Sequence, residues 1–85
     1  MWRAIIIVKY KEGILDPEAK TIHHALGTLG YHVVTDLTTG KYFEVEIDGS
    51  LSRAEAEKVV QEISSKILSN PVVQRFTYEL TEDKA

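Results

Sequence analysis

The feature that most constrains this chain is the strict alternation of apolar and polar residues from Tyr42 to Ile47, YFEVEI. Alternation with a period of two is typical of a strand with one buried face. A weaker alternation occupies Val33–Leu37, and Thr38-Thr39-Gly40 between the two runs supplies a glycine that a tight reversal with positive φ requires. Residues 32–48 therefore predict a β-hairpin.

The run Trp2–Tyr10, WRAIIIVKY, carries isoleucine and valine at both odd and even positions. This composition predicts a strand that is covered on both faces. A layer of helices covers only one face of a sheet. We therefore expect a second copy of the protein or a partner subunit against the other face.

Two helices are predicted, one on each side of the hairpin. Asp16 and Pro17 suit the start of the first helix, because aspartate accepts hydrogen bonds from first-turn amides and proline forfeits no bond there. Its apolar residues recur at spacings of three and four and predict one core-facing stripe, followed by a left-handed C-cap at Gly30. The stripe consists of Ala19, Ile22, Leu26 and Leu29.

Ser52-Arg53-Ala54-Glu55 matches a capping box at the start of the second helix. Asn70-Pro71 is expected to end that helix, because proline disfavours helical geometry at the preceding residue. A final strand is predicted over Val72–Leu80, and the charged tail Thr81–Ala85 is expected to fray.

These elements predict one domain over residues 1–85, in the order β-α-β-β-α-β. The expected fold class is α+β: a two-layer sandwich in which a four-stranded antiparallel sheet carries both helices on one face. This arrangement is ferredoxin-like or a close variant, and the pattern leaves the strand order open.

Composition narrows the function. The chain has no cysteine, which excludes disulfides, thiolate metal sites and a cysteine nucleophile. Its net charge of −3 makes nucleic acid and anionic membranes poor partners. No apolar run approaches the roughly 20 residues that span a bilayer, so a cytoplasmic protein is expected.

The sequence contains no motif typical of catalysis: no phosphate-binding glycine loop, no GxSxG and no HExxH. His23 and His24 are adjacent on a predicted helix and point about 100° apart, so they cannot converge on one metal without help from another element. Glu44 and Glu46 share a strand face, but a solvated or interface strand explains them more simply than paired catalytic carboxylates. We predict no catalytic, cofactor-binding or metal-ligating residue in this chain.

Four segments resemble one known family in order and spacing: Gly13–Pro17, Ala25–Tyr31, Gly40–Glu44 and Asn70–Val73. The chain is similar to PurS, the small subunit of phosphoribosylformylglycinamidine (FGAM) synthase in purine biosynthesis. Two residues depart from the usual pattern, Ala19 at the first helix and Thr38 before Gly40. The family motif falls on Asp16, Pro17, Gly40, Lys41, Asn70 and Pro71, and the resemblance implies that these positions shape contacts with partners. From the residues alone, Asp16 and Asn70 are interpreted as helix-cap and helix-stop residues, and Lys41 as a solvated turn lysine.

The resemblance also implies a non-catalytic connector with no cofactor of its own. A large synthetase subunit would use ATP and magnesium, and a glutaminase subunit would supply ammonia from glutamine. This chain would form a homodimer or tetramer, bridge the two subunits and help ammonia pass between them. The alternative from a different class is a small-molecule-sensing regulatory dimer of the ACT type, which uses the same order of elements.

Overall fold

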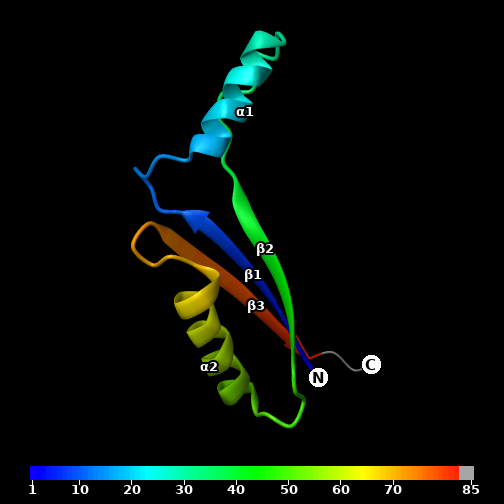
Figure 1. Cartoon of the computed structure of the whole chain (residues 1–85). Helices are drawn as coiled ribbons and strands as arrows, with labels where there is room; N and C mark the ends of the chain where they lie inside the picture. The colour runs from blue at the N-terminus through cyan, green and yellow to red at the C-terminus, as the bar shows by residue number, and fades with distance from the viewer. Residues whose placement is uncertain (83–85) are drawn as a thin grey trace.

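The centre of the molecule is β1 (Trp2–Tyr10), the middle strand of a three-stranded antiparallel sheet with the order β2-β1-β3. The computed structural model describes residues 1–82. The flanking strands are β2 (Gly40–Ile47) and β3 (Gln74–Glu82), and both run alongside nearly the whole of β1 (Figure 1). The β-branched residues of β1 suit a central strand, because they pack well against neighbours on both sides.

One face of the sheet packs against α2 (Arg53–Ile63), which continues as a π-helical turn, η1 (Ser64–Leu68). Ala4, Ile6 and Val8 on β1 are almost completely buried against this helix, together with Val60. Burial of each large aliphatic side chain contributes about 1.5–3 kcal/mol. This sheet-and-helix layer therefore holds the hydrophobic core.

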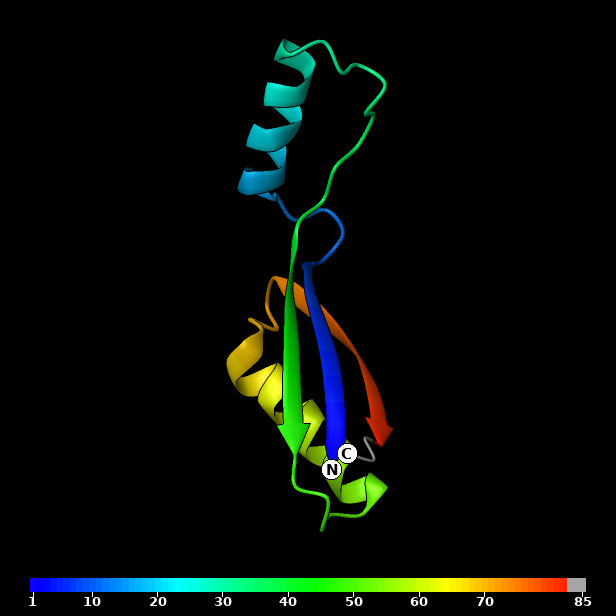
Figure 2. The ribbon, with the colours of Figure 1, turned by 90° about the vertical axis from the view of Figure 1, so that its right-hand side faces the viewer.

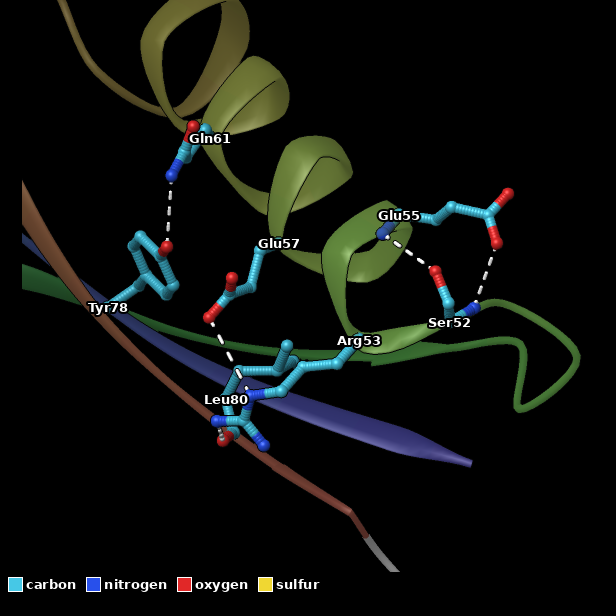
Figure 3. Close-up of polar contacts among 7 residues, drawn as sticks. All are labelled: Ser52, Arg53, Glu55, Glu57, Gln61, Tyr78 and Leu80. Carbon is cyan, nitrogen blue, oxygen red and sulfur yellow. Dashed lines mark hydrogen bonds and ion pairs between the residues drawn. The ribbon is translucent and has the colours of Figure 1, made fainter.

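The start of α2 is held by the capping box that the sequence predicts, as Figure 3 shows. The Ser52 hydroxyl accepts a hydrogen bond from the Glu55 amide at 3.2 Å, and the Glu55 carboxylate accepts one from the Ser52 amide at 2.9 Å. Arg53 donates to the Leu80 carbonyl at 3.0 Å and so joins the first turn of α2 to β3 (Figure 3).

The first helix, α1 (Pro17–Thr28), does not join this core. It stands beyond the end of the sheet as a projecting arm, and the chain returns from it along residues 29–39 (Figures 1 and 2). Within the predicted stripe only Ala19 is buried, while Leu29 is 73% exposed. The Cα radius of gyration is 16.7 Å, whereas a compact chain of this length has about 12 Å. The molecule is therefore elongated.

The predicted β-hairpin is wrong in its first half. Residues 31–39 form a turn and an extended segment, with no strand over Val33–Leu37. Gly40 does not reverse the chain with a positive φ; it is the first residue of β2 and lies opposite Lys9 of β1. The alternating run 42–47 pairs instead with β1, because that strand offers eight partners and an apolar face to share.

Three further expectations are corrected. Over residues 1–82 the sheet has three strands, not four, and α2 alone lies on its face, so the two helices do not share one layer. The last strand begins at Gln74 rather than Val72, because residues 70–73 form a turn closed by the Asn70 carbonyl. The predicted fraying is wrong for Thr81 and Glu82, which pair with Arg3 and Trp2 of β1, and the rest of that tail lies outside the described residues.

Other local predictions are confirmed. Asp16 caps α1 with Pro17 in its first turn, and Gly30 follows the helix with φ = 93°. The second helical segment ends at Leu68, just before Asn70-Pro71. The part of the chain that the structure describes has an α+β fold with three antiparallel strands and two helices.

Candidate functional site

The motif residues of the first helix and of β2 meet where the arm joins the sheet. One carboxylate oxygen of Asp16 accepts a hydrogen bond from the Ala19 amide at 2.9 Å and caps α1. The other oxygen accepts from the Thr39 amide at 3.0 Å and from the Thr39 hydroxyl at 2.8 Å. Asp16 thus fastens the base of the arm to the residue that precedes β2.

These hydrogen bonds, led by the one from the Ala19 amide, hold the pKa of Asp16 below its ordinary value of 3.8. The carboxylate is therefore ionised at neutral pH. Each of its hydrogen bonds is charge-assisted, the stronger kind in proteins. These hydrogen bonds hold the base of the arm in place, and we call this contact the Asp16–Thr39 joint.

Gly40 has a packing role at the same place. A Cβ atom at this position would lie 2.8 Å from the Val8 carbonyl oxygen and 3.2 Å from Cγ of Lys9. Only glycine lets β2 approach β1 this closely at the end of the ladder. The side chain of the next residue, Lys41, is exposed.

Asn70 and Pro71 form the turn that leads into β3. The Asn70 side-chain oxygen accepts a hydrogen bond from the Val72 backbone amide at 3.1 Å. The Asn70 backbone amide donates to the side-chain oxygen of Gln74 at 2.8 Å. The turn lies at the same end of the sheet as Gly40, since β2 and β3 both begin beside the end of β1. In the described part of the chain, no hydrogen bond or ion pair joins Asn70 or Pro71 to the Asp16–Thr39 joint.

A cavity of about 330 Å³ opens between the arm and the end of the sheet. Besides Asp16 and Thr39, its lining includes Lys9, Lys11 and Arg75, which the sequence reasoning did not select. The spacing Lys9-x-Lys11 places both lysines on one side of a strand and could have signalled part of this cluster. Arg75 could not be added, because its position opposite Lys9 depends on the register between β1 and β3.

The sheet face opposite α2 has no covering element in residues 1–82. Its central residues include Ile7, which is 39% exposed, and Tyr42, which is 60% exposed and lies directly opposite Ile7. Charged residues are spread over the same face: Ile5 lies between Glu44 and Glu79, and further pairs stand nearer the ends, as in Arg3 with Glu46 and Lys9 with Arg75. We call this surface the open face. A surface that mixes exposed aliphatic and aromatic side chains with charged ones suits a protein interface.

The described residues offer little for metal binding. No group of three or more His, Asp or Glu side chains in residues 1–82 is arranged to hold a metal ion. His23 uses its Nε2 atom in a 2.8 Å hydrogen bond with the Val34 carbonyl, which links α1 to the returning segment. None of the helices in this part of the chain combines the length and the apolar character needed to cross a bilayer.

Fold and surface together define a class: a small α+β protein whose core uses one sheet face, while the other face and a helical arm are uncovered in residues 1–82. Comparison with known proteins identifies which subunit family this is. The family model for PurS, phosphoribosylformylglycinamidine (FGAM) synthase, matches residues 3–82, and the chain belongs to this family.

Individual relatives and solved structures indicate the same family. The phosphoribosylformylglycinamidine synthase subunit PurS of Bacillus subtilis is 34% identical over 82 residues, covering 96% of this chain and 95% of the relative. The crystal structure of Methanocaldococcus jannaschii PurS, described as one of the subunits of formylglycinamide ribonucleotide amidotransferase in the purine biosynthetic pathway, is 30% identical. Its TM-score is 0.86, covering 99% of this chain and 100% of that one. The structure of PurLQS from Thermotoga maritima contains a chain with a TM-score of 0.80 and 24% identity, covering 95% of this chain and 99% of that chain, which shows the fold alone.

The family predicted from the sequence is thus confirmed, and it is that of an FGAM synthase subunit in purine biosynthesis. The alternative of an ACT-type regulator finds no support in these comparisons. The roles of the six motif residues as partner contacts stay predictions. For Asp16, Gly40 and Asn70 the structure shows a local structural role, and Pro17 lies in the first turn of α1.

Proposed function

We propose that this chain is the non-catalytic assembly subunit of an FGAM synthase. In this role it bridges an ATP- and magnesium-dependent synthetase subunit and a glutaminase subunit, and it helps ammonia pass between them. The chain itself carries no cofactor and acts in the cytoplasm. The observation that carries the proposal is the family match across residues 3–82, nearly the whole chain.

The surface supports a role in assembly. The accessible surface is 6313 Å², whereas a compact monomer of 9.6 kDa exposes about 5,100 Å². The excess of about 1,200 Å² is larger than the roughly 800 Å² that each partner buries in a standard protein interface. An 85-residue chain that leaves so much surface in water is stabilised when other chains cover it.

We assign the open face, centred on Ile7 and Tyr42, to contact with another chain. Self-association as a homodimer or tetramer and docking of the larger subunits are both part of this proposal. The outer edges of β2 and β3 also have unpaired backbone groups, which can extend the sheet into a neighbouring chain.

Reconstitution tests the assembly role. The synthetase and glutaminase subunits are mixed with and without this chain, and FGAM formation is measured with glutamine or with ammonium chloride as the nitrogen source. We expect glutamine-dependent turnover to require this chain, while turnover at high ammonium concentration does not. Equal glutamine-dependent turnover without the chain would refute the proposal.

A matched pair of variants tests whether the open face contacts another chain. Ile7→Lys places a charge at the centre of the open face, whereas Ile67→Lys places the same charge on η1, where Ile67 is 77% exposed. We expect Ile7→Lys to lower the molar mass in sedimentation equilibrium or to reduce glutamine-dependent turnover, and Ile67→Lys to do neither. If the two variants behave alike, the open face is not the contact surface.

A further inference from the structure

Three cations gather at one end of the open face without a carboxylate partner. Lys9 and Arg75 lie directly opposite each other on β1 and β3, which places their Cβ atoms about 5 Å apart. The Lys11 amide donates to the Val73 carbonyl at 2.9 Å and so continues the same ladder, two residues beyond Lys9. In residues 1–82, the side chains of these three residues make no hydrogen bond and no ion pair.

Like charges placed directly opposite across two strands destabilise a sheet. An anion bound between Lys9 and Arg75 would offset this repulsion. The three cations line the cavity of about 330 Å³ at the joint, so an anion that enters this cavity can reach all of them.

The remaining walls of the cavity have the opposite character. The arm side contributes Asp16, Asp36 and the threonines 38 and 39, and the loop between β1 and α1 contributes Glu12. The Asp16 carboxylate already accepts three hydrogen bonds, and one oxygen of Asp36 accepts the Leu37 amide at 2.9 Å. Three cations and three carboxylates leave the cavity near neutrality, but the two signs come from different elements.

The separation of cationic and carboxylate walls indicates which kind of ligand fits the cavity. A simple polyanion would be attracted to the sheet side and repelled by the arm side. A molecule with a phosphate at one end and hydroxyl groups at the other satisfies both, because the phosphate accepts from Arg and Lys while hydroxyls donate to carboxylates. The volume lies at the lower end of the 300–1,000 Å³ typical of ligand pockets, roughly the size for one phosphorylated sugar rather than a dinucleotide.

We propose that the cavity between the arm and the sheet is a binding site for a phosphorylated sugar, with Lys9, Lys11 and Arg75 holding the phosphate and Asp36 accepting from sugar hydroxyls. The site goes beyond the assembly role and does not depend on it. Because Asp16 and Thr39 form both the joint and part of the cavity wall, a bound ligand would also fix the arm relative to the sheet.

The experiment is a ¹H–¹⁵N NMR titration of the full chain with ribose 5-phosphate, inorganic phosphate and ribose. We expect saturable shifts for the amides of Lys11 and Thr39 with ribose 5-phosphate, about tenfold weaker binding of inorganic phosphate, and no binding of ribose. Arg75→Gln and Lys9→Gln should each weaken ribose 5-phosphate binding about tenfold. Lys58→Gln makes the same charge change on the exposed side of α2 and should leave binding unchanged.

Asp36→Asn tests recognition of the sugar independently of recognition of the phosphate. It should weaken binding of ribose 5-phosphate and leave inorganic phosphate binding equal or stronger, because a negative charge near the phosphate is removed. Far-UV circular dichroism confirms that each variant is folded, and the cations are tested separately so that one unfolded variant does not decide the result. Absence of saturable shifts, equal affinity for inorganic phosphate and ribose 5-phosphate, or equal weakening by Lys58→Gln would each overturn the proposal. None of these outcomes bears on glutamine-dependent turnover.

Discussion

The substitution Gly40→Ala tests whether this motif glycine is required by packing rather than by a partner. The new Cβ atom would lie 2.8 Å from the Val8 carbonyl oxygen, and the oxygen belongs to the backbone of the central strand, which cannot rotate away. Relief requires β2 to move from β1 at the first pair of the ladder. Forced overpacking of this kind costs about 1–3 kcal/mol.

One effect opposes this cost. Alanine reduces the conformational entropy of the unfolded chain and stabilises by about 0.4–1 kcal/mol where the native backbone accepts it. The central values of these two ranges, about 2 and about 0.7 kcal/mol, leave a net loss of about 1.3 kcal/mol. Since 1 kcal/mol shifts the thermal midpoint of a small domain by about 4–8 °C, we expect a fall on the order of 5–10 °C.

The assay is thermal unfolding followed by circular dichroism, at one fixed protein concentration because self-association would raise the midpoint. Gly27→Ala is the matched control. Gly27 lies within α1, and a Cβ atom added there would meet no atom within 4 Å apart from its chain neighbours and the backbone of its own helix. Alanine is also a better helix former than glycine, so the midpoint of this control should stay equal or rise. A midpoint for Gly40→Ala at or above that of the unsubstituted chain would refute the close-approach argument and favour a partner-contact role for Gly40.

Three other predictions follow from single contacts. Because the folded-state pKa of Asp16 lies below 3.8, its stabilisation is complete above that value and is lost as the pH falls through the folded-state pKa. The difference in thermal midpoint between pH 7 and pH 3 should therefore be smaller in Asp16→Asn, and an unchanged difference would contradict the assignment. Ser52→Ala removes the N-cap of α2 and should lower the unfolding free energy measured in urea by about 1 kcal/mol, whereas an unchanged midpoint would mean that the capping box contributes nothing. Ile6→Val should cost about 0.5–1.5 kcal/mol at any protein concentration, because Ile6 is fully buried. Ile7→Val should cost less in dilute solution and more as the concentration rises; a cost independent of concentration would argue against self-association through the open face.

The local elements of this chain followed from sequence patterns. The cap at Asp16, the capping box at Ser52, the left-handed glycine after α1 and the alternation over 42–47 each depend on residues within a few positions of one another. Such short-range interactions are encoded by adjacent side chains and need no tertiary partner. The six motif residues were selected by their order and spacing along the chain, and their role as partner contacts stays a prediction.

Long-range strand pairing decided the arrangement of the sheet, the position of α1 and the existence of the cavity. Two apolar runs, Val33–Leu37 and Trp2–Tyr10, competed as partners of Tyr42–Ile47, and the choice of β1 depended on forming a continuous ladder and a shared core face. That choice left residues 31–39 without a strand partner and carried α1 away from the core, so its apolar stripe became arm surface. The cavity of Lys9, Lys11 and Arg75 likewise exists only because the register of β1 with β3 brings together residues more than 60 positions apart in sequence.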